Sequence, residues 1–186
     1  MSRFAVIDTE TTWADAVMSI GLVIAESGTF GLIDKRYYIL TPYKNHGGMY
    51  AHALYARNHA PDLECPRKQA MGDLLSFLED YGIVDIFAYN AAFDYGHLPE
   101  LSHLVWYDIM KLAAYRRHNP KIPESAECWK TGRLKRHYGV ESMYRLLSGD
   151  ETYCETHNAL GDALDELEIM KRLNHDLDRY VRLRPA

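Results

Sequence analysis

An apolar strand that carries two carboxylates constrains this chain more than any other feature of its sequence. Residues 4–10 open with aromatic and β-branched side chains, which predicts a β-strand. Because successive side chains of a strand point to opposite faces, Asp8 and Glu10 are expected to be neighbours on one face. Two carboxylates this close repel each other unless a cation lies between them, and Mg²⁺ prefers such oxygen ligands. The pair therefore indicates a metal site or, since so short a pattern is common by chance, solvated surface charge.

A second predicted strand leads into a helix that adds a third carboxylate. Residues 83–90 are typical of a buried strand, and residues 91–94 of the start of a helix. Asn90 then suits the N-cap position, and Asp94 lies in the first turn. Asp94 could serve only to favour the positive end of the helix dipole. Alternatively, it joins Asp8 and Glu10 at one site.

A long amphipathic helix near the C-terminus supplies a fourth carboxylate and a histidine. Asp162 falls on the flank of its apolar stripe, where the carboxylate can reach the edge of a sheet without being buried under it, and Gly161 leaves room for close backbone approach. His157 is expected in the loop before the helix, either as a surface residue or as an imidazole placed to act as a base. The stripe that predicts this helix within the segment 157–173 consists of Leu160, Ala163, Leu164, Leu167, Met170 and Asn174.

These three segments resemble the three motifs of the DEDDh 3′→5′ exonucleases, a family that includes the proofreading subunits of bacterial replicases, ribonuclease T and oligoribonuclease. The resemblance covers about residues 4–173. The sister DEDDy group has a tyrosine four residues before the last aspartate, where this chain has Asn158, so the resemblance is to the h group. It implies an α/β fold of the ribonuclease-H-like type, with a mixed central β-sheet and helices on both faces. The matching motifs are Asp8-Thr-Glu10, Asn90-Ala-Ala-Phe-Asp94 and His157-Asn-Ala-Leu-Gly-Asp162.

The resemblance also implies a role for each site residue. Asp8, Glu10 and Asp162 would bind one divalent ion, Mg²⁺ or Mn²⁺. Asp8 would bridge to a second ion that Asp94 holds through water. Two cations roughly 3.5–4 Å apart can stabilise both the attacking and the leaving oxygen of an in-line phosphoryl displacement. His157 would accept the proton of the attacking water, a contribution of roughly 10²–10⁴-fold. The expected substrate contacts are Thr9, Glu10, which would hold the terminal 3′-hydroxyl, Asn90 and Phe93.

The chain departs from the family in two places. Members often have a His-Gly-Ile-Thr-like element where this chain has residues 41–61. His46-Gly-Gly-Met49 resembles that element only loosely. Trp13 stands where glycine is common in relatives. It could stack on the terminal base or, as a large aromatic residue beside a hairpin, pack against the protein.

The segments between the motifs complete an α/β pattern. Alternating apolar residues predict strands, and apolar residues at helical spacing predict a helix before the second motif. The expected elements are strands at 18–25 and 35–40 joined by a hairpin at 27–31, a helix at 66–81, a strand at 104–107, and a helix capped by Asp108.

Size and composition suit one exonuclease domain spanning residues 1–186. The sequence has no apolar run long enough to span a membrane and no N-terminal signal, so we expect a soluble, cytoplasmic protein.

The net charge of −5 argues against a long duplex footprint. Basic residues gather at 116–118 and 130–137, with Trp129 and Tyr138 interleaved; such a patch could grip a few terminal nucleotides, although most of these charges are expected to solvate helix faces.

The sequence therefore predicts a metal-dependent 3′→5′ exonuclease that releases nucleoside 5′-monophosphates from single-stranded ends of DNA or RNA. Within enzymes, the alternatives are an exoribonuclease specific for very short RNA and one that acts on structured RNA ends. Outside enzymes, the alternative is a non-catalytic nucleic-acid-binding or polymerase-associated module. The presence of all five site residues favours an enzyme. Stand-alone members of the family are often homodimers, which the resemblance extends to this chain.

Overall fold

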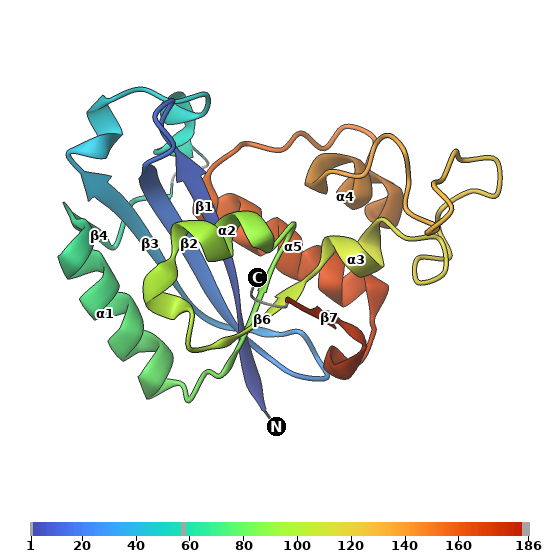
Figure 1. Cartoon of the computed structure of the whole chain (residues 1–186), viewed down its shortest axis with the longest axis horizontal. Coiled ribbons are helices and arrows are strands. Elements are labelled where there is room, and N and C mark those ends of the chain that lie inside the picture. The colour runs from blue at the N-terminus through green and yellow to red at the C-terminus, as the bar shows by residue number, and fades with distance from the viewer. Residues whose placement is uncertain (1, 57–58, 184–186) are drawn as a thin grey trace.

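A mixed β-sheet with helices on both faces forms the framework of the chain (Figure 1). The computed structural model describes residues 2–56 and 59–183. Within these residues the strands lie in the order β4-β3-β2-β1-β5-β6-β7. Strand β1 pairs antiparallel with β2 and parallel with β5, so the sheet is mixed. This arrangement confirms the predicted α/β fold class.

The first three strands form an antiparallel meander: β1 (Arg3–Thr11), β2 (Val17–Glu26) and β3 (Leu32–Thr41). The predicted hairpin joins β2 to β3 and is closed by the N–H of Phe30, which donates to Glu26 O over 3.0 Å. The remaining strands are β4 (Leu63–Pro66) beside β3, the parallel pair β5 (Asp85–Ala88) and β6 (Val105–Asp108), and β7 (Val181–Arg182) at the far edge. All the strands expected from the sequence are therefore present, within a few residues at their ends.

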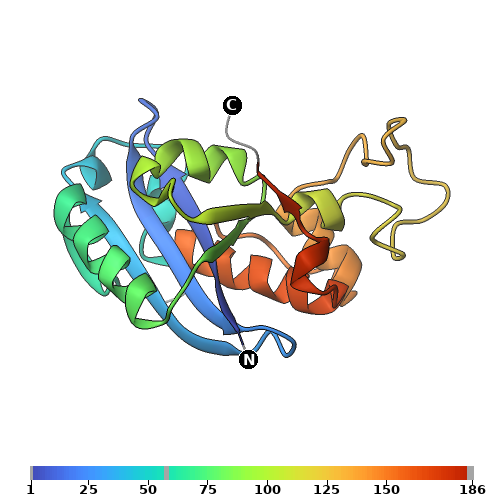
Figure 2. The same ribbon diagram turned by 60° about the horizontal axis from the view of Figure 1, so that its bottom comes forward.

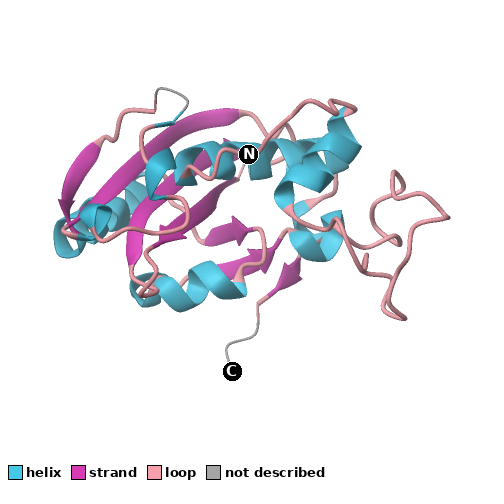
Figure 3. Cartoon of the chain, turned by 90° about the horizontal axis from the view of Figure 1, so that it is seen from above, coloured by secondary structure: helices cyan, strands magenta, loops and turns pink. Residues whose placement is uncertain are grey.

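Alternation along β1 separates two cores. Phe4 and Val6 belong to the core under α3 (Met110–Ala113), α4 (Val140–Ser148) and α5 (Ala159–Leu173). Ala5 and Ile7 belong to the core under α1 (Arg67–Asp80) and α2 (Ala92–His97). Figure 3 shows the helices on both sides of the sheet. Short 3₁₀ turns lie at Tyr43–Asn45, Ala51–Ala53, Pro99–Leu101 and Leu177–Arg179. None of the helices within residues 2–56 and 59–183 is long and apolar enough to cross a bilayer.

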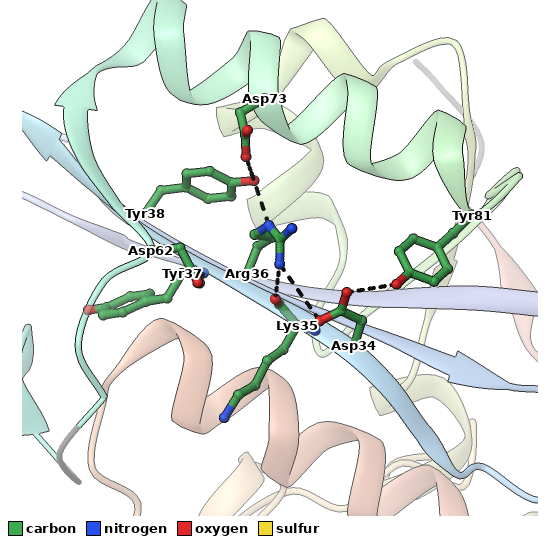
Figure 4. A network of polar contacts seen from close by, with 8 residues as sticks. All are labelled: Asp34, Lys35, Arg36, Tyr37, Tyr38, Asp62, Asp73 and Tyr81. Atoms are coloured by element: carbon green, nitrogen blue, oxygen red, sulfur yellow. Dashed lines mark hydrogen bonds and ion pairs between the residues drawn. The ribbon is translucent and has the colours of Figure 1, made fainter.

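Tyrosine hydroxyls join α1 to the neighbouring strand β3 (Figure 4). Tyr38 donates to Asp73 Oδ2 over 2.8 Å, and Tyr81 donates to Asp34 Oδ2 over 2.7 Å. The guanidinium of Arg36 lies between the two carboxylates, 3.7 Å from Asp34 and 4.0 Å from Asp73. Because these groups are partly exposed, the ion pairs add little stability, and the network mainly sets the position of α1.

The ends of two helices differ from the prediction. Helix α5 starts at Ala159, and the side chain of Asn158 caps it by accepting from Gly161 N over 3.1 Å. Asn174 ends the helix in a left-handed conformation, φ 50°, so it does not extend the apolar stripe. Asp108 is not the N-cap residue of α3, which is Ile109, although its Oδ1 accepts from the N–H of Met110 over 3.0 Å.

Helix α5 lies against β1 and β2 (Figure 2), and a glycine in β2 makes this approach possible. Gly21 pairs with Asp8 in the sheet. A Cβ atom at Gly21 would lie 2.1 Å from Ala159 O and 2.2 Å from Leu160 N, which are backbone atoms of the first turn of α5. Because Gly21 has no side chain, the first turn of α5, which carries Asp162, can lie close to β2 beside Asp8.

We expect Gly21→Ala to lower the free energy of unfolding by about 1–3 kcal/mol, because the backbone of α5 must shift away from β2. The matched control is Gly72→Ala in α1, where an added Cβ has no heavy atom within 4 Å. That substitution should stabilise the protein by about 0.4–1 kcal/mol, since alanine restricts the unfolded chain. Urea unfolding of both variants measures the difference. Equal effects of the two substitutions would contradict the close packing of α5 on Gly21.

Candidate active site

Three structural elements, β1, α2 and α5, bring acidic residues together near the C-terminal end of the central strand β1. Asp8 and Glu10 lie near the end of β1, on the face that also carries Phe4 and Val6 and is covered by α5. Since β1 and β5 are parallel neighbours, their C-terminal ends lie side by side. The chain enters α2 directly after the C-terminal end of β5. Loops at the C-terminal ends of parallel strands are a common location for binding sites.

Glu10, His157 and Asp162 form a group of possible metal ligands. One ligand atom from each residue lies within 4.8 Å of the ligand atoms of the other two. Glu10 comes from β1, His157 from the loop before α5, and Asp162 from the first turn of α5. Asp162 is only 3% exposed, so the expectation that it stays unburied at the flank of the helix is wrong. The reason is the close contact between α5 and the sheet, which covers its first turn.

Asp94 approaches the group from the opposite face of the sheet. It lies in the first turn of α2, as predicted, and is 2% exposed. Thr9 points to that face, between Asp8 and Glu10 in sequence, and its Oγ1 donates to Asp94 Oδ1 over 2.8 Å. Thr9, expected to contact the substrate, thus uses its hydroxyl to position Asp94.

Burial and mutual repulsion raise the pKa values of these carboxyl groups. Burial, and then the charges of Asp94 and Glu166, hold the pKa of Asp8 well above its ordinary value. Burial and the charge of Asp162 raise the pKa of Glu10 to about 9. Burial raises the pKa of Asp94 to about 7, although the hydrogen bond from Thr9 opposes this increase. The site cannot hold several ionised carboxylates without positive charge nearby.

The donor set fits a divalent cation. Asp8 Oδ2 is buried and accepts no hydrogen bond from the residues that the structure describes. A buried carboxylate oxygen without a donor is unfavourable unless a cation binds to it. Carboxylate oxygens are the ligands that Mg²⁺ and similar hard ions prefer. The unpartnered oxygen and the raised pKa values of the neighbouring carboxyls therefore both suit a metal at this position.

Glu166 is a fifth acidic residue near this group, and it lies outside the three sequence motifs. It lies one turn after Asp162 on α5 and is 1% exposed. Its Oε2 accepts from the N–H of Tyr89 over 3.1 Å, and its charge raises the pKa of Asp8. The missed signal was its position between Ala163 and Met170 on a buried helix face, where a carboxylate needs a specific partner.

His157 lies outside the helix, as predicted, and an aromatic ring holds it in place. Its imidazole stacks on Tyr50, with 3.7 Å between ring centroids and 16° between planes. Its backbone is left-handed, φ 53°, and Nδ1 is 3.9 Å from Glu155 Oε1. Burial lowers the pKa of His157, which favours the neutral imidazole. Tyr50 belongs to the segment that departs from the family pattern, so the sequence did not predict this contact.

The remaining predicted substrate contacts, Asn90, Phe93 and Trp13, are all exposed. Asn90 is exposed and left-handed, φ 61°, and the N-cap of α2 is Ala91, so the predicted capping role of Asn90 is wrong. The tight turn out of β5 instead directs its N–H to Asp108 Oδ1 over 3.2 Å. Phe93 is 41% exposed. Trp13 is 71% exposed, which excludes packing in the core.

Metal-free protein should lose stability as the pH rises. The folded state keeps protons on Glu10 and Asp94 that unfolded carboxyls release near pH ~4, so stability must fall between that value and the folded pKa values of about 7 and 9. Mg²⁺ should restore more stability at pH 9 than at pH 5. Thermal unfolding with and without chelator measures both effects, since 1 kcal/mol shifts the Tm by about 2–4 °C at this chain length. A Tm independent of pH in chelator would contradict the raised pKa values.

Solved structures of nucleases share this fold at low sequence identity. Exonuclease X, in complex with 5′ overhanging duplex DNA, is 22% identical, with 90% of each chain covered and a TM-score of 0.55. The nuclease domain of 3′hExo, a DEDDh family member bound to rAMP, is 14% identical, with 100% of this chain and 98% of that chain covered and a TM-score of 0.67. E. coli Exonuclease I, in complex with a dA16 oligonucleotide, is 13% identical, with a TM-score of 0.63; the match covers 96% of this chain and 42% of that chain.

Comparison with protein-family models finds no match, and neither does comparison with curated proteins. The structural likeness nevertheless establishes the fold, which the chain shares with Exonuclease X and with the nuclease domain of 3′hExo.

Proposed function

We propose that this chain is a single-domain, metal-dependent 3′→5′ exonuclease that hydrolyses single-stranded ends to nucleoside 5′-monophosphates. The observation that carries the proposal is the grouping of Glu10, His157 and Asp162 within 4.8 Å, beside the unpartnered oxygen of Asp8. The nucleic-acid ligands of Exonuclease X and Exonuclease I in their solved complexes support this substrate class. A buried acidic cluster is costly to maintain, which favours an enzyme over a non-catalytic binding module.

Four carboxylates would hold the metal: Asp8, Glu10, Asp94 and Asp162. Two divalent ions, Mg²⁺ or Mn²⁺, would supply positive charge to the phosphate oxygens as negative charge develops on them. The protein's own contribution is to keep these carboxylates close together despite their repulsion. Thr9 does this for Asp94, and the contact of α5 with Gly21 does it for Asp162.

His157 is the proposed general base. It would accept a proton from the water that attacks the terminal phosphodiester, and the neutral imidazole that its lowered pKa favours can do so. Its nearness to Glu10 and Asp162 also permits metal ligation. Stacking on Tyr50 restricts the orientation of the ring, so that the proton acceptor is positioned before the substrate binds.

The substrate end would be held by residues around this centre. Glu10 is the proposed partner of the terminal 3′-hydroxyl. The exposed rings of Phe93 and Trp13 and the exposed side chain of Asn90 are available to the last nucleotide. Base stacking on such rings is tolerant of sequence.

Products should appear as mononucleotides released from the 3′ end. A linear single strand labelled at its 5′ end should shorten one nucleotide at a time with Mg²⁺ or Mn²⁺ and stay intact with chelator. A 3′-phosphate should block release because it occupies the position of the terminal hydroxyl, whereas a 5′-phosphate should have no effect. Gel analysis of DNA and RNA strands in parallel measures the polarity and the preferred sugar. Cleavage of a circular single strand would show an endonuclease instead.

A further inference from the structure

A strongly basic segment projects from the end of the molecule beyond α3 and α4 (Figures 1 and 3). We call residues 115–138 the basic arm. It carries seven lysines and arginines and two glutamates, a formal charge of +5, while the rest of the chain carries −10. This separation of charge favours contact between the arm and a polyanion.

The basic arm has a defined conformation although it contains no long helix or strand. Tyr115 and Cys128 pair with Arg133 and Leu134 through isolated β-bridges. The N–H of Trp129 donates to Arg133 O over 2.8 Å, closing a turn. Leu134 is 6% exposed and packs into the core under α5. The arm is therefore anchored to the domain and can present its side chains in fixed positions.

Two exposed aromatic rings of the basic arm each have a cation beside them. Trp129 is 53% exposed, and Lys135 Nζ lies 5.7 Å from the centre of its ring. Tyr138 is 38% exposed, and the guanidinium of Arg133 lies 5.1 Å from the centre of its ring. A single strand presents bases and phosphates alternately, so each ring can stack on a base while the adjacent cation meets a phosphate. An acidic protein would satisfy the cations but would leave the rings without a specific partner.

One tyrosine links the arm to the acidic site. The N–H of Tyr89 donates to Glu166 Oε2 over 3.1 Å, and the hydroxyl of the same residue donates to Tyr138 O. The base of the arm thus lies one side chain away from the carboxylate cluster. A strand whose 3′ end is in the candidate active site can reach the arm with nucleotides nearer its 5′ end.

We propose that the basic arm is a second nucleic-acid-binding site, which holds single-stranded nucleic acid on the 5′ side of the nucleotide being removed. This assignment rests on the proposed exonuclease function and extends it, because it makes affinity depend on strand length. A strand long enough to reach both regions gains the contacts of the arm, whereas a dinucleotide engages only the acidic site.

The test compares Lys130→Ala/Lys135→Ala with Lys35→Ala/Lys68→Ala, two pairs of exposed lysines with the same change in charge. For a single strand of roughly 20 nucleotides, the arm variant should have a KM about tenfold higher, while its kcat/KM for a dinucleotide is unchanged. Its binding should also depend less on salt, by a slope of about 1.4 for two lost phosphate contacts. Trp129→Ala should weaken binding of the long strand about tenfold.

Fluorescence anisotropy with a long strand in chelator tests the arm without cleavage. A loss of affinity in the arm variants alone supports the proposal even if no nucleotide is ever released, so failure of the enzymatic function is distinguished from failure of the arm. Unchanged affinity in the arm variants overturns the proposal and leaves an acidic protein surface as the partner. An equal loss in Lys35→Ala/Lys68→Ala also overturns it, because the effect would then be one of net charge.

Discussion

Asp8→Asn should lower nucleotide release at least about 10³-fold and should make the metal-free protein more stable. The loss of activity follows because the substitution removes a proposed metal-ligand charge and no core volume, and metal stabilisation of a transition state is worth several kcal/mol. The gain in stability follows because the charge of Asp8 is unfavourable in the folded protein without metal, as its raised pKa shows. Asp162→Asn should lower nucleotide release in the same way, because it too removes a proposed metal-ligand charge. Activity assays and thermal unfolding in chelator measure the two effects on one preparation.

Asp80→Asn is the control for this prediction, since it makes the same chemical change at an exposed aspartate at the end of α1. It should leave both quantities unchanged. Loss of activity together with loss of stability in Asp8→Asn would indicate misfolding. Isothermal titration with Mg²⁺ then tests the metal assignment directly, because that assignment requires the variant to bind Mg²⁺ more weakly than the wild type does. Full activity in purified Asp8→Asn or Asp162→Asn would rule that assignment out.

The parts of the site that depend on local periodicity could be predicted from the sequence. Strand alternation places Asp8 and Glu10 on one face, and the strand-to-helix transition places Asp94 in the first turn of α2. Helical periodicity also predicts α5 almost to its ends. These signals are local because each depends on residues a few positions apart.

The remaining parts depend on contacts between distant segments. The burial of Asp162 follows from the approach of α5 to Gly21, about 140 positions earlier in the chain. The stacking of Tyr50 on His157 joins two loops, and the contact of Glu166 with Tyr89 joins a helix to a strand end. The left-handed backbone of Asn90 results from a tight turn, whereas its side chain alone suggested a cap. No periodic pattern encodes such pairings.

His157→Ala should lower kcat by roughly 10²–10⁴-fold while the affinity for metal and substrate changes little, because the imidazole is proposed to accept a proton and not to bind either. His52→Ala is the matched control, since His52 is an exposed histidine whose charge acts on His157. That variant should keep nearly full activity. Single-turnover rates and metal titrations of both variants separate turnover from binding. Loss of metal affinity in His157→Ala would show that the histidine is a ligand.

The pH dependence of the rate gives a second test of His157. An ordinary imidazole would lose its activity as a base below about pH 6.5. Burial lowers the pKa of this one, so the neutral form persists at lower pH and the acidic decline in kcat should lie below that value. In His157→Ala this decline should disappear or change its midpoint, and added imidazole should restore part of the rate by occupying the space beside Tyr50. The substitution removes only the stacked imidazole ring. Full turnover with an unchanged dependence of kcat on pH would therefore show that His157 is not the base, and that another group accepts the proton.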